Sequence, residues 1–223
     1  MELKFKVERH GNYGRSFHTN VTVGKSMIDL YASWLSDSYV DALRNQGRTV
    51  ADMVRDLLRV DDVADIFVEP CEVSVYLDSR RPWVRWDENI DRIVENTFKR
   101  LHREQGHLPG KKVVVKKSPS DSWKEFHANF EVSQSAIENF QRPLRLSSER
   151  YLERVGPTGA KLVRRLITLP GVTEIWVKPY EVTIYIGQAF SWVERDRNAK
   201  TLKDKVQEAF EQVFGDDIAF VTE

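Results

Sequence analysis

The chain has 223 residues, with 34 Lys+Arg against 34 Asp+Glu and 41% hydrophobic residues, a composition typical of one large or two small globular domains. Its formal net charge of +0 provides no overall field that would attract nucleic acid or an anionic membrane, so such binding would need a local basic patch. Cys71 is the single cysteine, which excludes an intramolecular disulfide framework and a Cys-x-x-Cys metal motif.

Charged residues interrupt every apolar run well before the roughly 20 residues that span a membrane. The first residues, "MELKFK", lack the apolar core of a signal peptide. A lone cysteine also fits a reducing compartment. We therefore expect a cytoplasmic protein that is not exported and does not enter a membrane.

Two strands are predicted at the start of the chain. Leu3, Phe5 and Val7 alternate with polar residues, which indicates a strand with one apolar face, and residues 17–23 form a second run of this kind. The polar stretch "RHGNYGRS" between them predicts the turn of a hairpin. Residues 26–46 show no clear periodicity.

A helix, two short strands and a second helix are predicted next. Apolar residues at helical spacing follow Thr49, a residue type that favours a helix N-cap. Residues 65–68 and 72–77 have the pattern of strands that meet at Pro70, since proline lacks an N–H group and suits a turn. A single apolar stripe over residues 90–101 predicts the last helix of the series.

The same series occurs twice. "VEPCEV", residues 68–73, returns as "VKPYEV", residues 177–182, and Phe17-His18-x-Asn20 returns at the same spacing as Phe126-His127-x-Asn129. A shared alternation would explain matching apolar positions, but not matching polar and aromatic positions. We interpret the chain as a tandem duplication of one unit of domain size.

A glycine- and proline-containing segment, "HREQGHLPGKK" at residues 102–112, separates the copies, because its composition cannot continue a helix. We place the first domain at residues 1–106 and the second at residues 107–223. Each copy predicts a β-β-α-β-β-α unit. The fold class is therefore α+β, with an antiparallel sheet in each unit and the helices packed on one face.

Two runs carry a resemblance to a known family: "LLRVDDVADIFVEPCEVSVYLDSRRPWVRWDENIDRIVENTF" and, in the second copy, "LITLPGVTEIWVKPYEVTIYIGQAFSW". They resemble the N-terminal domain of the Nfu/NifU-type iron–sulfur scaffold proteins. That family shows a helix, a Gly-Val pair, an apolar strand, a turn, a Val-Thr-Val strand and a tryptophan. Gly171-Val172, Val182-Thr183-Ile184 and Trp192 match this pattern, whereas Asp62-Val63 keeps only the valine.

The resemblance implies a scaffold or protein-contact module. Proteins of that family hold their cluster on a separate domain with a Cys-x-x-Cys pair, since thiolates are the usual cluster ligands, and the sequence contains no such motif. We therefore expect no cofactor in the chain itself. An iron–sulfur cluster would be reached only through a partner, or through a chain-to-chain use of Cys71.

Three residues are candidate metal ligands: His18, His127 and Cys71. The two histidines occupy equivalent positions, which favours paired ligands or acid–base groups. The alternative is a strand histidine satisfied by its neighbours, because duplication retains structural residues equally well, and the sequence reveals no carboxylate constellation beside either one. Cys71 aligns with Tyr180, which favours a packing role in the turn.

Tryptophans and lysines are the candidate partner-binding residues. Trp83 and Trp192 are equivalent and are predicted to pack under the last helix of each copy, whereas Trp86 and Trp123 are candidates for contact with a partner. Lys111 and Lys112 belong to a basic run around the linker. This run would meet a partner, or would form one solvated strand face.

We expect a non-catalytic scaffold or protein-interaction protein with a protein partner, because no catalytic set, phosphate-binding loop or nucleophile elbow is found in the sequence. Two alternatives stay open. One is a nucleic-acid-associated protein that uses the basic linker patch. The other is a metal-binding protein or enzyme that uses the paired histidines.

Overall fold

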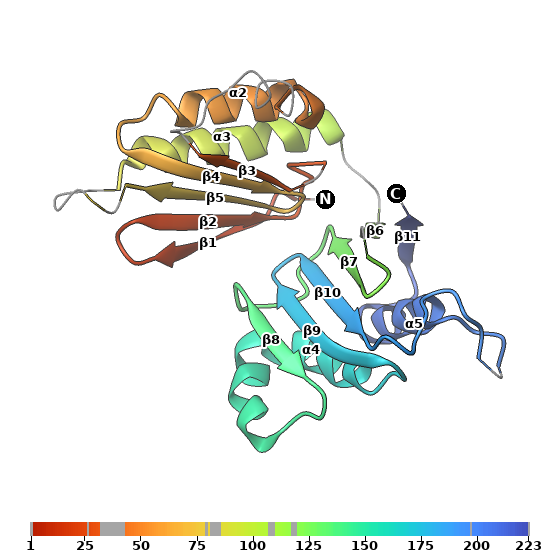
Figure 1. The fold of residues 1–223 in the computed structure, drawn as a ribbon. Coiled ribbons are helices and arrows are strands. Elements are labelled where there is room, and N and C mark those ends of the chain that lie inside the picture. Colours follow the sequence, from red (N-terminus) through yellow and green to blue (C-terminus); the bar gives the residue numbers. More distant parts are fainter. Residues whose placement is uncertain are drawn as a thin grey trace. The chain divides into compact units, whose positions relative to one another are not determined.

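The computed structural model describes residues 2–25, 27–31, 43–78, 80, 86–106, 110–116, 120–196 and 198–222. Within these residues the chain is a mixed α+β protein with two sheets (Figure 1). It divides into two compact units, Met1–Pro109 and Gly110–Glu223. Each unit has its own cluster of buried apolar side chains. The division falls inside the segment 102–112, a few residues after the boundary expected from the sequence.

The sheet of the first unit is antiparallel, with the strand order β1-β2-β5-β4-β3. Its strands are β1 (Phe5–His10), β2 (Gly14–Thr19), β3 (Ile28–Tyr31), β4 (Val63–Glu69) and β5 (Glu72–Leu77). Its helices are α2 (Arg48–Leu57) and α3 (Glu88–Gln105). The apolar residues of α2 that recur at helical spacing, Val50, Met53, Val54 and Leu57, are all buried.

The sheet of the second unit has the strand order β11-β6-β7-β10-β9-β8. Its strands are β6 (Lys111–Lys116), β7 (Trp123–Ala128), β8 (Glu138–Gln141), β9 (Val172–Lys178), β10 (Glu181–Ile186) and β11 (Ile218–Thr222), and its helices are α4 (Glu149–Ile167) and α5 (Leu202–Phe214). Non-helical backbone at Gly156 kinks α4 just before Pro157. Leu162, Val163 and Leu166, which follow the kink, are fully buried.

The expected β-β-α-β-β-α order is incomplete, because a third strand precedes the first long helix of each unit. These strands, β3 and β8, have four residues each, too few for an alternation that stands out in the sequence. The second unit also ends in β11, which pairs parallel with β6. Its sheet is therefore mixed, and the prediction of an antiparallel sheet is wrong for this unit.

The asparagines of the repeated motif fix the first strand of each sheet. The Asn20 side-chain oxygen accepts a hydrogen bond from the Lys4 backbone N–H at 2.8 Å, and Asn129 does the same for Lys112 at 2.8 Å. An asparagine can satisfy a peptide group that the ladder leaves without a backbone partner. The repetition of this residue therefore has a structural reason.

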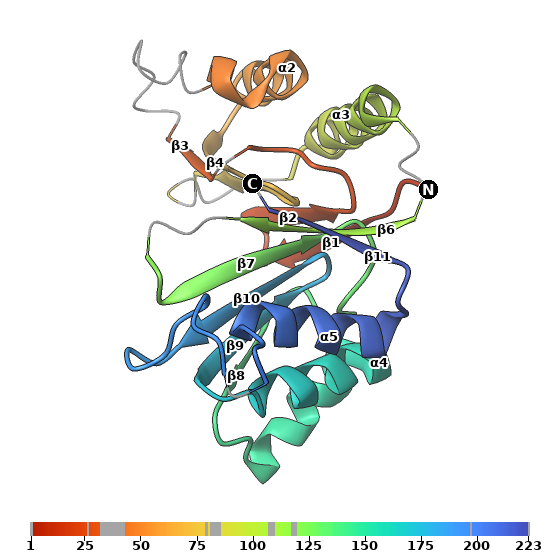
Figure 2. The ribbon, with the colours of Figure 1, turned by 90° about the vertical axis from the view of Figure 1, so that its right-hand side faces the viewer.

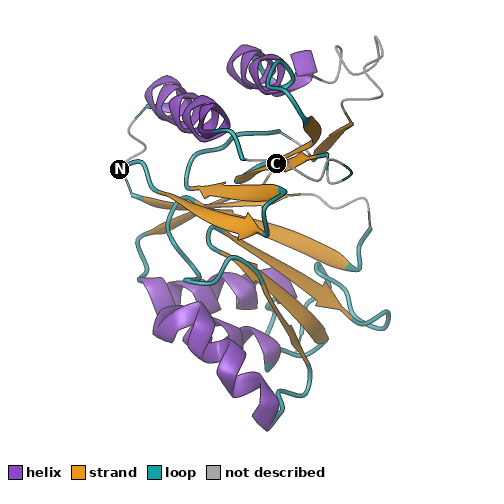
Figure 3. Ribbon diagram, turned by 90° about the vertical axis from the view of Figure 1, so that its left-hand side faces the viewer, coloured by secondary structure: helices purple, strands orange, loops and turns teal. Residues whose placement is uncertain are grey.

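The helices of each unit cover one face of its sheet, as Figures 2 and 3 show. Phe17, Val73 and Val75 face α2 and α3 in the first core, and Phe126, Val182 and Ile184 face α4 and α5 in the second. Strand residues alternate between the two faces. The neighbours of these core residues therefore lie on the opposite face, which we call the helix-free face.

None of the helices in the described residues combines the length and the apolar character that a membrane span requires.

Candidate functional site

The helix-free face of each sheet collects polar and aromatic side chains at equivalent positions. In the first unit these residues are His10, Ser16, His18, Asp65, Phe67, Glu69, Glu72, Ser74 and Tyr76, with Lys6 and Glu8 from β1. In the second unit they are Trp123, Glu125, His127, Glu174, Trp176, Lys178, Glu181, Thr183 and Tyr185, with Lys112, Val114 and Lys116 from β6. We treat these two faces as the candidate functional sites.

His18 lies between two carboxylates in the first unit. Its Nδ1 is 3.4 Å from Glu72 Oε2 on β5, and its Nε2 is 3.7 Å from Glu8 Oε2 on β1. Glu72 also accepts a hydrogen bond from the Ser74 hydroxyl at 2.7 Å. The group therefore links three neighbouring strands with β2 at its centre.

The second unit repeats this arrangement around His127. Its Nδ1 is 3.5 Å from Glu181 Oε2 on β10, and its Nε2 is 2.8 Å from Glu125 Oε2 on β7 itself. The Thr183 hydroxyl donates to Glu181 at 3.2 Å. A Glu-His-Glu group with a hydroxyl beside one carboxylate is thus present in both units.

Both ring nitrogens of each histidine lie 2.8–3.7 Å from a carboxylate oxygen, which is an acceptor for a ring N–H. A histidine that ligates a metal or removes a proton needs a neutral ring with one lone pair directed at its target. In both Glu-His-Glu groups, the ring nitrogens lie beside carboxylates of the same sheet. Within the described residues, no three His, Cys, Asp or Glu side chains are arranged to hold a metal ion.

Aromatic rings cross the helix-free face of the first unit. His10 stacks on Tyr76 with 5.6 Å between ring centroids, and Phe67 meets Tyr76 edge-on at 5.7 Å. The intervening strand carries Gly14 opposite both His10 and Tyr76. A Cβ at Gly14 would lie 2.5 Å from the Tyr76 ring, so glycine is what allows the two rings to meet across β2.

The second unit has an aromatic row at the same level. Trp123 is the residue equivalent to Gly14 in the second unit. Its ring lies 6.2 Å from that of Tyr185, its cross-strand partner. Trp176 on β9 continues the row at 6.5 Å from Tyr185 and is 37% exposed. Aromatic side chains of this size give a binding surface most of its contact energy.

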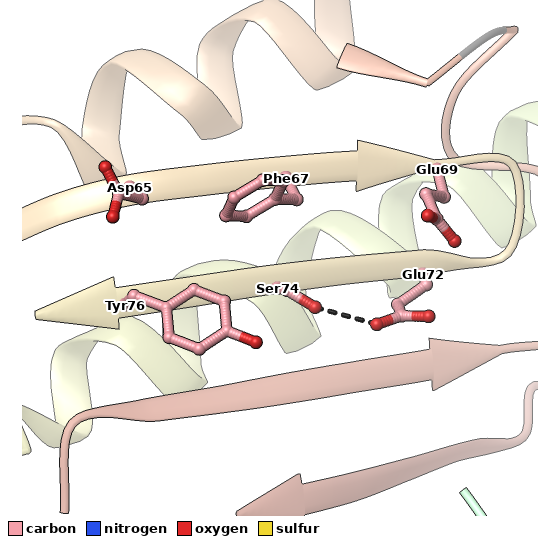
Figure 4. A pocket seen from close by; sticks show the side chains of 6 residues that line it. All are labelled: Asp65, Phe67, Glu69, Glu72, Ser74 and Tyr76. Atoms are coloured by element: carbon pink, nitrogen blue, oxygen red, sulfur yellow. Dashed lines mark hydrogen bonds between the residues drawn. The ribbon is translucent and has the colours of Figure 1, made fainter. Parts of the chain in front are cut away.

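A hollow of about 410 Å³ opens on the helix-free face of the first unit. Figure 4 shows the side chains that line it, from β4 and β5: Asp65, Phe67, Glu69, Glu72, Ser74 and Tyr76. Its charged groups are all carboxylates. Burial raises the pKa of Asp65, and Asp29 and Asp78 raise it further. Burial, followed by the charge of Glu72, raises the pKa of Tyr76. The hollow is therefore acidic and has aromatic walls.

The predicted tryptophans lie on different faces. Trp86 lies on the helix side of the first unit, where its indole N–H donates to Asp91 at 3.0 Å and the Arg15 guanidinium lies 4.4 Å from its ring centre. Trp123 lies on the helix-free face of the second unit. Trp192 is buried in the second core, and Trp83 lies outside the described residues.

The two predicted lysines point to opposite faces of β6. Lys111 Nζ donates to the Phe214 carbonyl at the end of α5 and to Asp217 Oδ1 at 3.1 Å, so it caps that helix. Lys112 lies on the helix-free face, with Asn129 bonded to its backbone. These neighbours in sequence therefore do not form one basic patch.

Cys71 does not fit the ligand set of an iron–sulfur cluster within this chain. It is the single cysteine of the sequence, and its side chain is buried in the turn between β4 and β5. Its carbonyl accepts a hydrogen bond from the Thr19 backbone N–H at 2.9 Å. A cluster needs several thiolates, so the geometry is that of a packed turn residue.

The carboxylates beside the histidines are the residues that sequence reasoning missed. Glu72 and Glu181 belong to the repeated "VEPCEV" and "VKPYEV" phrases, and each lies directly across the sheet from the repeated histidine. Their joint retention in both copies was the available signal. Glu8 and Glu125 come from different strands in the two units, so repetition could not reveal them.

No family model matches this chain, and a search of the curated proteins gives no significant match.

Proposed function

We propose that this chain is a non-catalytic scaffold or protein-interaction protein, whose partner binds on the helix-free faces of the sheets. The observation that carries the proposal is the pairing, in both units, of an aromatic row with a Glu-His-Glu group on the face that the unit's own helices do not cover. A solvated strand face ordinarily carries small or charged polar side chains. Two rows of tyrosine, tryptophan and phenylalanine are typical of a contact surface.

The charge of the first unit's hollow favours a basic partner residue. Asp65, Glu69 and Glu72 supply carboxylates, and Phe67 and Tyr76 supply aromatic walls. A lysine or arginine side chain satisfies both features, because its stem packs on rings and its head pairs with carboxylates. We therefore propose that the partner presents a lysine or arginine side chain to this face.

Affinity capture from native lysate tests this proposal. The wild-type chain is compared with a variant that carries Phe67→Ala and Asp65→Asn in the hollow. We expect discrete partners to be retained by the wild type and lost from the variant. Arg55→Ala is the matched control, because Arg55 is exposed on α2, a helix that covers the other face of the same sheet. Equal capture by all three proteins, or no specific capture by the wild type, would contradict the proposal.

The positions of the lysines on β6 support a nucleic-acid partner less than they support a protein partner. Lys111 is engaged with Asp217 and the end of α5, and Lys112 points to the other face of the strand. Phosphate binding requires cations that are clustered and available. Unchanged mobility of RNA and DNA at low salt in the presence of the chain is the expected result.

The metal and iron–sulfur alternatives also have less support. Both nitrogens of each repeated histidine face carboxylates, and one buried thiol cannot supply the ligands of a cluster. If the protein takes part in iron–sulfur assembly, we propose that it does so by binding a partner that holds the cluster. Anaerobic reconstitution of the purified chain with iron and sulfide is expected to give no cluster absorbance.

A further inference from the structure

The equivalent edge of the sheet is paired with a further strand in the second unit and not in the first, among the strands that the structure describes. In the second unit, β11 lies parallel to β6 over residues Ile218–Thr222 and closes that edge of the sheet. In the first unit the equivalent strand is β1, which begins its own sheet order. Among the strands that the structure describes, none of this sheet pairs with the outer side of β1. The duplication therefore provides one edge with an added strand and one edge without it.

The two edges present the same backbone groups. The Lys4 carbonyl accepts from the Asn20 N–H at 3.2 Å, and the Lys112 carbonyl accepts from the Asn129 N–H at 3.0 Å. Because bonded pairs alternate along an antiparallel ladder, the peptide groups of Phe5 and Val7 point away from β2. Those of Val113 and Val115 point away from β7 in the same way, toward β11.

The edge of β1 lacks the backbone features that block strand addition, although the strand carries the charged residues Lys6, Glu8 and Arg9. All residues of β1 pair with β2 in an unbroken register, and the strand has no proline and no bulge. The charged side chains of Lys6 and Glu8 lie on the helix-free face, out of the plane in which a new strand would pair. The outward peptide groups of Phe5, Val7 and Arg9 therefore form a regular edge for backbone hydrogen bonds.

Apolar surface on the helix side of β1 is also available. Val7 is 43% exposed, although it lies on the same face as the buried Phe17. Phe5 meets Phe98 of α3 at 6.1 Å, as Phe220 of β11 meets Phe210 of α5 at 5.9 Å. Phe5 therefore already fills part of the space that β11 fills in the second unit, whereas Val7 is left uncovered.

We propose that the outer edge of β1 accepts a parallel β-strand from a partner protein, as β6 accepts β11. The incoming segment is mostly apolar, like the Ile-Ala-Phe-Val-Thr of β11. In the register of β11, the position of Phe220 lies beside Phe5 and the position of Thr222 beside Val7. A small apolar residue fits the first position and a larger one the second. This edge is distinct from the helix-free faces, so the inference does not depend on the proposed function.

A synthetic peptide tests the proposal on the full chain. The probe has the sequence of residues 216–223 with Phe220→Val and Thr222→Ile, and a spin label is attached at its N-terminus. Amide signals of the isotope-labelled protein are followed by NMR. We expect saturable shifts and slower exchange at Phe5, Val7 and Arg9, with the spin label broadening Leu3 and Phe5 more than Arg9, because a parallel strand starts beside Leu3.

Two variants of Val7 provide the control. Val7→Pro removes the outward N–H without removing a bond to β2, and proline is tolerated at edge strands, whereas Val7→Thr keeps the N–H. Peptide binding is expected to be lost in the first and kept in the second, with unchanged β5 amides in both. A peptide with proline at positions 220 and 221 supplies the same test without changing the protein. Broadening strongest at Arg9, shifts at Val113 and Val115 instead of β1, or binding unaffected by the prolines would overturn the proposal.

Discussion

Gly14 is the residue whose missing side chain shapes the aromatic surface of the first unit. The His10 and Tyr76 rings stack across it, and an added Cβ would lie 2.5 Å from the Tyr76 ring. We expect Gly14→Ala to lower the free energy of unfolding by about 1–3 kcal/mol, the usual effect of overpacking, as measured by urea denaturation.

Gly187→Ala is the matched control for this substitution. The nearest atom to a Cβ at Gly187 is Thr173 Cγ2 at 3.5 Å, an ordinary contact. Its urea midpoint should stay close to that of the wild type. If both variants lose equal stability, the close approach of Tyr76 to Gly14 does not account for the effect.

Asp65 carries an unfavourable charge on the same face. Its pKa is raised above 3.8 by burial and by Asp29 and Asp78, so this carboxyl is protonated more readily in the folded state than in the unfolded chain. The stability linked to this group is complete below pH 3.8 and is lost as the pH rises through the folded-state pKa. Asp65→Asn should therefore raise the free energy of unfolding at pH 7, measured by urea denaturation, by less than about 1 kcal/mol, because the site is partly solvated.

The pH dependence separates this effect from a change in packing. The gain from Asp65→Asn should disappear near pH 3, where the wild-type carboxyl is also neutral. Asp52→Asn is the control, because Asp52 pairs with Arg55 and Arg100, and its removal should give no gain at pH 7. A gain that persists at low pH would show that the charge is not its cause.

Sequence reasoning at the residue scale found the histidines but not their surroundings. His18 and His127 stood out because they repeat, whereas Glu8 and Glu125 reach them from different strands of their units. Which carboxylate lies across a sheet depends on the register of pairing, and a one-residue shift would move it to the other face. The chemistry of the site therefore could not be derived before the strands were paired.

At the scale of elements, long periodic segments were predictable and short ones were not. Helix α2 lies where the spacing of Val50, Met53 and Leu57 predicts it, and β5 has the predicted bounds at residues 72–77. Strands β3, "IDLY", and β8, "ENFQ", are short edge strands whose pairing with β4 and β9 defines them. Their local sequence carries too little pattern to distinguish a strand from a loop.

The turn at Pro70 shows why the repeated phrase was easier to place than to interpret. Pro70 and Pro179 follow β4 and β9 at the hairpins to β5 and β10. Their carbonyls accept hydrogen bonds from the Val23 and Val132 N–H groups, each at 2.8 Å. The phrase thus also holds the segment after the second strand, a long-range contact that no local pattern reports.

At the scale of the whole molecule, the duplication gives each unit its own core. Leu57 and Leu166 are equivalent, both fully buried, and each belongs to the cluster of its own unit. Leu57→Ala and Leu166→Ala should each remove about 2–5 kcal/mol of stability. Hydrogen exchange resolved by segment should locate the first loss in residues 1–109 and the second in residues 110–223. Loss of protection across both units in either variant would contradict two separate cores.

The parallel pairing of β11 with β6 has a consequence for the order of folding during synthesis. The described strands and helices of the first unit all lie between Phe5 and Gln105. The sheet of the second unit joins Lys111 to Ile218, so its outermost pair cannot form until β11 has left the ribosome. Pairings so far apart in sequence form slowly, because a long loop must close before any bond is gained. Until then the nascent chain exposes the bare edge of β6, and this is the stage at which it would be most open to pairing with another chain.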